Sequence, residues 1–351
     1  MSRFFSEKYR ALEPYVPGEQ PQNRQYVKLN TNESPYPPSP AVVQRVAEET
    51  ARAQLYSDPD CTRLRRALAE MLDVGPENIL PGNGSDEVLN FIFAAYGDDA
   101  HPFLFPNISY GFYPVFCAQN RVPFREIPLR PDFTVDPADY VGAAGHVVLA
   151  NPNAPTGVAL GRDVIEELVK SSPDRVVVID EAYVDFGAES CVPLTKQYDN
   201  LLVVQTFSKS RSLAGARIGF AVGAAELIAD LNTLRCSVNP YNLSRMALAA
   251  GEAAIADNAY YMQNCRRIAE TRGQTAARLR EMGFRVLPSR ANFLFAASDR
   301  ISGLALYQKL KERGVLVRHF EKPGIADFNR ITIGSPEQME RFFQETEEIL
   351  K

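Results

Sequence analysis

The stretch Arg175-Val176-Val177-Val178-Ile179-Asp180-Glu181-Ala182-Tyr183 decides the fold. Its β-rich run at residues 175–179 is apolar without interruption from Val176 to Ile179, which predicts a strand covered on both faces in a mostly parallel sheet. In open α/β sheets, ligands gather at the carboxyl ends of the strands. Asp180 and Tyr183, which follow the run, are therefore predicted to lie at a ligand site.

Further runs of the same kind extend this pattern along the chain. They lie at residues 102–105, 146–150 and 201–205, with a fifth candidate strand at 217–222. Helical stretches lie between several of them, and residues 42–53 and 62–72 carry helical patterns before the first run. Strands that alternate with helices predict an α/β fold, with a mostly parallel central sheet flanked by helices.

The chain divides into three predicted parts. Residues 1–40, rich in Pro, Asn and Gln, are expected to form an extended arm. Residues 41–245 form the predicted large domain, and residues 246–351 a smaller α+β domain. Long helices at 243–283 are expected to link the two, and short strands are expected at 291–295, 315–318 and 330–333.

Composition narrows the class of protein. The chain has 351 residues and a formal net charge of -5, which argues against a nucleic-acid binder. Its start has no apolar region typical of a signal peptide, and no apolar stretch reaches the ~20 residues of a membrane helix. The five cysteines and three histidines are scattered, so we expect no metal site, reduced thiols in the cytoplasm, and an organic cofactor.

A polar cluster follows the run at 201–205. It reads Thr206-Phe207-Ser208-Lys209-Ser210. A lysine at the end of a strand can form an imine with an aldehyde cofactor and later move protons. Thr206, Ser208 and Arg217 can donate to a phosphate. The alternative is a solvated lysine in a polar loop.

The carboxylate of Asp180 would be costly to bury at the end of an apolar run without a partner. A protonated pyridine nitrogen is a suitable partner, because the pair keeps the ring able to accept electrons. Tyr183 can hydrogen-bond a phenolic oxygen of such a ring. The alternative is that Asp180 caps a helix.

Three loops supply further candidates. Residues 82–87, Gly-Asn-Gly-Ser-Asp-Glu, open a helix whose backbone N–H groups can hold a phosphate, or they merely cap it. The aromatic stretch at 109–113 can stack on a heteroaromatic ring or belong to the core. The turn at 151–157, Asn-Pro-Asn-Ala-Pro-Thr-Gly, is rigid and offers an asparagine amide to a ring oxygen.

Taken together, these motifs resemble the fold-type I aminotransferases that use pyridoxal 5'-phosphate, and most closely the histidinol-phosphate aminotransferase family. The resemblance covers nearly the whole chain. Beyond the lysine and aspartate motifs, it rests on three segments: Lys28-Leu29-Asn30-Thr31-Asn32-Glu33-Ser34-Pro35-Tyr36, Leu55-Tyr56-Ser57-Asp58-Pro59 and Arg330-Ile331-Thr332-Ile333-Gly334.

The resemblance implies a role for each candidate residue. Lys209 would carry the cofactor as a Schiff base, Asp180 would pair with the ring nitrogen, and Tyr183 would bind the phenolic oxygen. Tyr110 would stack on the ring. The cofactor phosphate would be held by Gly84, Ser85, Asp86, Thr206, Ser208 and Arg217. Tyr56 would reach the phosphate of a partner subunit, which implies a homodimer.

The same resemblance implies a substrate site. Arg318 and Arg330 would bind the substrate phosphate in one half-reaction and a carboxylate of 2-oxoglutarate in the other. Tyr15, Asn30 and Asn292 would line the site.

The sequence departs from the family in two turns. An asparagine usually precedes Pro-Thr-Gly, whereas this chain has Ala154. The contact with the phenolic oxygen is therefore assigned to Asn153. Before the stacking aromatic, Ile108-Ser109 replaces the usual Pro-Thr or Pro-Ser.

The activity implied by the resemblance is a ping-pong transamination in histidine biosynthesis. Histidinol phosphate and 2-oxoglutarate would give imidazole-acetol phosphate and glutamate. Two enzymes on the same scaffold remain as alternatives, an aromatic amino acid aminotransferase and a threonine-phosphate decarboxylase. A non-catalytic regulatory module that binds pyridoxal phosphate is a third, although such a module usually carries a DNA-binding domain.

Overall fold

The computed structural model describes residues 2–351 and contains a large sheet of seven strands. Their order is β2-β8-β7-β6-β5-β3-β4. The strands are β2 (Ile79–Gly82), β3 (Phe103–Pro106), β4 (Phe124–Ile127), β5 (His146–Ala150), β6 (Val177–Asp180), β7 (Leu201–Thr206) and β8 (Gly219–Val222). Only β8 runs against its neighbours, so the mostly parallel sheet is confirmed.

Strand β8 begins two residues later than the sequence predicted. Arg217 has φ +53° and ends a short 3-10 turn at Ala214–Ala216. This left-handed backbone cannot continue a strand. The turn leaves the Arg217 side chain outside the sheet, next to the first turn of α3 (Ser85–Tyr96).

Helices cover both faces of the large sheet, as the continuous apolar runs require. Val177 and Ile179 of β6 join the core with α2 (Thr62–Leu72), α5 (Arg162–Lys170) and α7 (Arg245–Ala256). Val178 points to the opposite face and packs with α3, α4 (Tyr113–Asn120) and α6 (Ala225–Val238). Because side chains alternate along a strand, the side chains on both faces of β6 are buried from solvent.

The C-terminal part holds a second sheet, which is antiparallel. Its order is β12-β13-β10-β9. The strands are β9 (Phe284–Val286), β10 (Phe293–Ser298), β12 (Arg318–His319) and β13 (Phe328–Thr332), and helices α9 (Gly303–Glu312) and α10 (Pro336–Leu350) pack on it. The run predicted as one strand at 315–318 is split at Val317, because β11 (Val315–Leu316) pairs instead with β1 (Val27–Lys28).

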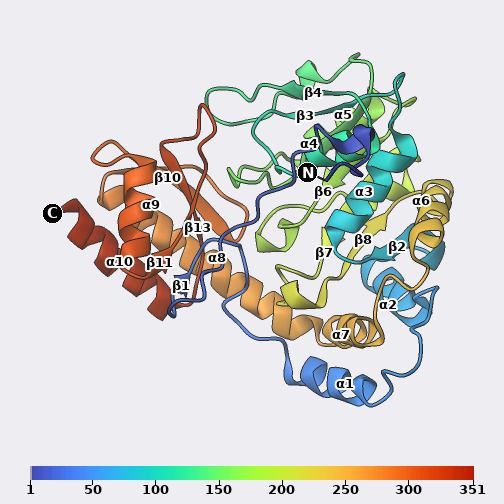
Figure 1. The fold of residues 1–351 in the computed structure, drawn as a ribbon, viewed down its shortest axis with the longest axis horizontal. Coiled ribbons are helices and arrows are strands. Elements are labelled where there is room, and N and C mark those ends of the chain that lie inside the picture. Colours follow the sequence, from blue (N-terminus) through green and yellow to red (C-terminus); the bar gives the residue numbers. More distant parts are fainter. Residues whose placement is uncertain (1) are drawn as a thin grey trace.

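A long helix joins the two sheets. In Figure 1, α8 (Asn258–Glu281) runs from the neighbourhood of α7 to the four-stranded sheet. Helix α1 (Pro40–Thr50) packs along α7. The first strand, β1, belongs to the predicted arm and yet pairs with the C-terminal part. The division at 41–245 and 246–351 stays a prediction. Across residues 2–351, every helix is too short or too polar to cross a membrane.

The register of the parallel strands places their carboxyl ends side by side. Ala150 of β5 lies opposite Asp180 of β6, which lies opposite Val204 of β7. The polar residues that follow these strands therefore meet at one edge, which is where the sequence predicted a ligand site.

One buried histidine links stability to pH. His146 Nδ1 accepts a hydrogen bond from the backbone N–H of Val176 at 2.9 Å, so Nδ1 is unprotonated, and Nε2 lies 2.9 Å from Tyr96 O. Burial lowers the pKa of His146 below its ordinary 6.5. The folded state thus favours the neutral ring. This contribution to the free energy of unfolding is complete above pH 6.5 and is lost as the pH falls through the folded pKa.

We therefore expect the urea concentration at the unfolding midpoint to decrease as the pH is lowered from about 7.5 to about 5.5, a window around the ordinary histidine pKa. The decrease should be steeper for the wild-type protein than for His146→Gln. Glutamine keeps a donor and an acceptor but takes up no proton. Urea unfolding followed by circular dichroism measures both slopes. His319→Gln, which changes the histidine of β12 stacked on Tyr307, is the matched control. Equal slopes in wild type and His146→Gln would contradict the assignment.

Candidate active site

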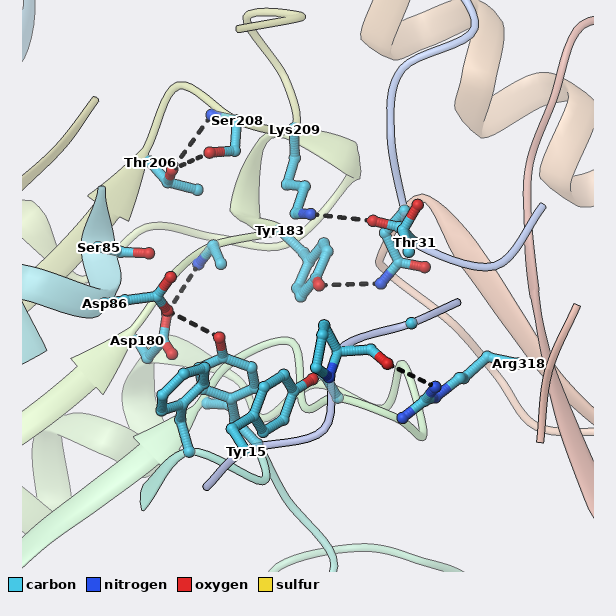
Figure 2. A pocket seen from close by; sticks show the side chains of 18 of the residues that line it. Tyr15, Thr31, Ser85, Asp86, Asp180, Tyr183, Thr206, Ser208, Lys209 and Arg318 are labelled. Carbon is cyan, nitrogen blue, oxygen red and sulfur yellow. Dashed lines mark hydrogen bonds between the residues drawn. The ribbon is translucent and has the colours of Figure 1, made fainter. Parts of the chain in front are cut away.

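A cavity of about 470 Å³ opens at the carboxyl edge of the large sheet. Figure 2 shows Thr206, Ser208, Ser85 and Asp180 on one side of it and Arg318 on the other, with Lys209 and Tyr183 between them. The predicted residues that line it are Tyr15, Ser85, Asp86, Tyr110, Asp180, Tyr183, Thr206, Ser208, Lys209, Arg217, Arg318 and Arg330. The fold thus brings most of the predicted site together.

Lys209 follows β7 and points its amine into the cavity (Figure 2). Nζ donates to the backbone oxygen of Thr31 at 3.2 Å. Burial, and next the positive charge of Arg330, lowers the pKa of Lys209 to about 8. An amine that gives up its proton near neutral pH can act as a nucleophile and as a base.

Asp180 ends β6 and is 5% exposed. Its carboxylate accepts hydrogen bonds from Tyr113 Oη at 2.9 Å and from the backbone N–H of Ala182 at 3.2 Å. Burial raises its pKa to about 6, although both hydrogen bonds oppose the shift. Within residues 2–351 it forms no ion pair with a lysine, arginine or histidine. A buried carboxylate without a cation fits the protonated ring nitrogen of the expected cofactor.

The start of α3, together with Thr206, Ser208 and Arg217, forms a concave group of donors beside Lys209 and Asp180, which we call the cup. Gly84, at φ +82°, precedes the helix, and a Cβ there would collide with the Arg217 guanidinium. A Cβ at Gly219 would collide with the backbone nitrogen of Ser85. The two glycines therefore let backbone N–H groups and Arg217 converge at a helix N-terminus, an arrangement that suits a phosphate.

More donors and one carboxylate complete the cup. The hydroxyls of Thr206 and Ser208 lie 3.0 Å apart. Asp86 accepts from Tyr110 Oη at 2.7 Å and from Arg217 Nη2 at 2.9 Å. The Asp86 carboxylate thus orients the Tyr110 hydroxyl and the Arg217 guanidinium together. The cup, the free amine of Lys209 and the carboxylate of Asp180 fit the three ends of pyridoxal phosphate.

Two guanidinium groups occupy the far side of the cavity. Arg318 of β12 and Arg330 of β13 lie directly opposite each other in the strand register. Like charges in such a pair repel. Burial lowers the pKa of Arg330, and the charge of Arg318 adds to this shift. An anion between the two side chains would relieve the repulsion, so the pair forms a candidate anion site.

The surroundings hold Arg330 rigidly in place. Its guanidinium stacks between the rings of Phe293 and Phe320, at 5.3 and 5.6 Å from their centroids. Nη2 donates to Asn30 O at 3.0 Å, and Nε has no partner among the residues described. Arg318 donates to the carbonyls of Val16 and Pro17 at 3.1 and 3.2 Å. The second guanidinium therefore also tethers the N-terminal arm.

The predicted Asn153 does not line the cavity. Its amide nitrogen donates to Ile108 O and Thr156 Oγ1, and its amide oxygen accepts from Ser109 Oγ. Both the nitrogen and the oxygen of the Asn153 side-chain amide therefore have hydrogen-bond partners in the surrounding loops. Ala154 faces the cavity in its place. The position of Asn153 gives no support to a contact with a phenolic oxygen.

Asn30 and Asn292 lie behind the cavity wall. Asn30 donates to Glu19 O at 2.8 Å, and Asn292 donates to Asn32 O at 2.9 Å. Tyr56 lies on the surface between α1 and α2, where it is 79% exposed and stacks on Tyr241 at 4.6 Å. Its predicted partner is another subunit, so its distance from this cavity leaves that prediction untested.

The sequence reasoning missed three residues that shape the site. Tyr113 bonds Asp180, but its segment suggested only an aromatic surface. Thr31 and Asn32 line the cavity, where they contact Lys209 and Tyr183 respectively. Both belong to the segment 28–36, in which only Asn30 was assigned a role in the site. Nothing in the local sequence indicates which distant side chains they meet.

Comparisons with known proteins agree with this geometry. The sequence profile of aminotransferase class I and II matches residues 24–345. Histidinol-phosphate aminotransferase 1 of Bradyrhizobium diazoefficiens is 51% identical over 350 residues, covering 100% of both chains.

Two solved structures share the fold. The histidinol-phosphate aminotransferase of Sinorhizobium meliloti, in complex with pyridoxal-5'-phosphate, aligns with a TM-score of 0.90 at 24% identity, covering 100% of this chain and 98% of that one. The L-threonine-O-3-phosphate decarboxylase of Porphyromonas gingivalis aligns with a TM-score of 0.81 at 23% identity, covering 92% and 99%. At these identities the likeness shows the architecture alone. The fold expected from the sequence, a large α/β part with a smaller α+β part, is confirmed.

The raised pKa of Asp180 predicts opposite effects on stability and on binding. Asp180→Asn should stabilise the protein without cofactor at pH 8 by roughly 1–3 kcal/mol. The reason is that the change removes a buried charge whose pKa is raised to about 6. The same change should weaken retention of pyridoxal phosphate. Urea unfolding and equilibrium dialysis measure the two effects.

Asp174→Asn, on the surface before β6, is the matched control and should change neither quantity. An Asp180→Asn protein that is both less stable without cofactor and unimpaired in binding it would overturn the interpretation of the site.

Proposed function

Because the chain belongs to the class I and II aminotransferase family, among the histidinol-phosphate aminotransferases, we propose that it transfers the amino group of histidinol phosphate to 2-oxoglutarate. The products are imidazole-acetol phosphate and glutamate, and the reaction serves histidine biosynthesis. One observation carries the proposal. A single cavity holds a lysine of lowered pKa, a buried carboxylate without a cation, and two opposed guanidinium groups.

The residues described above would hold pyridoxal phosphate in a defined orientation. Asp180 would face the ring nitrogen and Lys209 the aldehyde carbon, while Tyr110 would lie against the ring. The phosphate would sit in the cup formed by the start of α3, Ser208 and Arg217. When bound, this cofactor supplies an aldehyde for the substrate amine and a ring that takes up electrons from the substrate α-carbon.

The side chains of the chain itself perform the remaining work. Lys209 Nζ would take the proton from the substrate α-carbon and deliver it to the former aldehyde carbon of the cofactor, and its pKa of about 8 suits both transfers. The Asp180 carboxylate would keep a proton on the ring nitrogen. Arg318 and Arg330 bind the phosphate of one substrate and a carboxylate of the other, so one pair of cations serves both half-reactions.

The N-terminal arm lines one wall of the cavity with Tyr15, Pro17 and Gly18. The ring of Tyr15 stacks on Phe112 at 4.2 Å. Arg318 holds the next two residues of the arm by their carbonyls. This cover would exclude water from the reacting atoms, which strengthens every charge interaction inside.

We propose further that the protein works as a homodimer. Tyr56 and its stacking partner Tyr241 are exposed, and so are Leu55, Val43 and Val238. These side chains belong to α1, α6 and the segments next to them. A set of exposed apolar side chains such as this one is typical of a protein–protein interface. A second copy covering it would bring Tyr56 toward the phosphate cup of that copy.

We place the enzyme in the cytoplasm. All five cysteines are free, and Cys61, Cys117, Cys191 and Cys265 are buried. Free thiols persist in reducing compartments. This supports the proposed location together with the biosynthetic reaction.

The substrate proposal predicts a preference among amines. Loaded with pyridoxal phosphate, the protein should lose its visible absorbance faster with histidinol phosphate than with histidinol, which has the same amine but no phosphate for the arginine pair. Arg318→Gln should reduce this preference by about 10- to 100-fold, the worth of a charged hydrogen bond. Stopped-flow absorbance measures both.

Arg266→Gln, on the exposed face of α8, is the matched control and should leave the preference unchanged. Phosphothreonine tests the rival reaction. Release of carbon dioxide from it, faster than any turnover of histidinol phosphate, would favour the decarboxylase and contradict the proposed function.

The dimer proposal predicts complementation between two inactive variants. Lys209→Ala should abolish activity, and Tyr56→Ala should be inactive when pyridoxal phosphate is supplied below the dissociation constant of that variant, because it binds the cofactor phosphate weakly. When the two are unfolded and refolded together, a mixed dimer has one site with both changes and one intact site. Random pairing should then restore about a quarter of the wild-type activity.

If Tyr56 acts within its own subunit, every site of a mixed dimer carries one change, and activity stays at the level of the unmixed variants. That result, or a monomer in sedimentation of the wild-type protein, would overturn the shared site.

A further inference from the structure

We propose that Asn32 is a positioning residue that aims the Tyr183 hydroxyl at the phenolic oxygen of the cofactor, and that this chain relies on it because Ala154 occupies the usual place of an asparagine donor. The inference rests on the proposed cofactor site. It does not depend on which amine is the substrate.

The contact between Asn32 and Tyr183 sets the direction of the tyrosine proton. Asn32 Nδ2 donates to Tyr183 Oη at 2.9 Å. An amide N–H can only donate, so the tyrosine oxygen accepts there and its own proton points elsewhere. Tyr183 lines the cavity beside Lys209, as Figure 2 shows. Burial raises the pKa of Tyr183, so its hydroxyl stays protonated and remains a donor.

Thr332 determines which end of the Asn32 amide faces the tyrosine. The backbone N–H of Asn32 donates to Thr332 Oγ1 at 3.0 Å. The Thr332 hydroxyl donates its one proton to Asn32 Oδ1, also at 3.0 Å. With the amide oxygen held by Thr332, the NH₂ end of Asn32 points at Tyr183.

The backbone around Asn32 is equally constrained. Asn32 has φ +56°, a left-handed conformation that asparagine tolerates better than most residues. Its carbonyl accepts from Asn292 Nδ2 at 2.9 Å. Asn292, predicted to bind substrate, thus braces the residue that orients Tyr183. Asn32 is 1% exposed, so water does not compete for these contacts.

The turn at 151–157 explains why this contact matters here. Ala154 presents a methyl group to the cavity, and the Asn153 amide is fully used by its own loop. Neither residue offers a donor to a phenolic oxygen. The task falls to Tyr183, and a hydroxyl that is free to rotate would perform it poorly. Asn32 removes that freedom.

The consequence is spectroscopic. A donor to the phenolic oxygen stabilises its negative charge and so lowers the pKa of the neighbouring nitrogen that joins Lys209 to the cofactor. Without Asn32 that pKa, read from the visible absorbance of the loaded protein against pH, should rise by about half to one unit, the worth of one hydrogen bond. A residue that merely supported the fold would not move it.

The test compares Asn32→Gly with wild type. Glycine accepts the positive φ without strain, so the variant removes the amide and keeps the backbone. Asn32→Asp is the second variant, since its carboxylate would accept the tyrosine proton and turn it away from the cofactor; the pKa should rise further than with glycine. Asn329→Ala is the matched control, an equally buried asparagine whose amide donates to Gly303 O.

A double-mutant cycle with Tyr183→Phe separates the routes. If Asn32 acts through Tyr183, Asn32→Gly shifts the pKa in wild type and leaves it unchanged in Tyr183→Phe. Loaded Asn32→Gly protein that titrates like wild type, or that shifts equally in both backgrounds, overturns the inference. A wild-type protein that gains no visible band with pyridoxal phosphate would instead overturn the proposed cofactor site.

Discussion

The structure depends on one unbalanced charge, the carboxylate of Asp180 at the end of β6. The sheet buries it, Tyr113 and the backbone of Ala182 hold it, and no described lysine, arginine or histidine pairs with it. Folding alone gains nothing from such a group, because burial raises its pKa to about 6. A protonated ring nitrogen would balance the charge. The free energy that the folded protein loses by burying the unpaired carboxylate would then be recovered when the cofactor binds.

The arginine pair repeats this principle on the other sheet. Register places Arg318 and Arg330 face to face, and burial depresses the pKa of Arg330. The cavity therefore lies between an uncompensated anion and two crowded cations. A phosphorylated amine bound to the cofactor would satisfy both sides. Arg318 also tethers the N-terminal arm at the edge of the same cavity.

Local patterns predicted much of this arrangement. The continuous apolar run at 175–179 indicated a doubly covered strand, and the polar residues after such strands pointed to one edge, where Asp180 and Lys209 do meet. Strand direction and side-chain alternation are short-range properties, so local patterns predict them. Contacts that need a distant partner are not predictable in this way. Asn153 was assigned to the cavity by its place in a turn, and its amide is spent on Ile108, Thr156 and Ser109 instead.

The sequence by itself determined the class of fold, the strand ends that carry the chemistry, and the identity of the lysine and the aspartate, because each follows from residues close together in the chain. Tertiary structure alone decided that Tyr113 bonds Asp180, that Arg318 faces Arg330, and that Asn32 meets Tyr183 across 151 positions of sequence. The physical reason is the same in each case. A hydrogen bond depends on where the packed elements bring its two partners, and no local pattern encodes that distance.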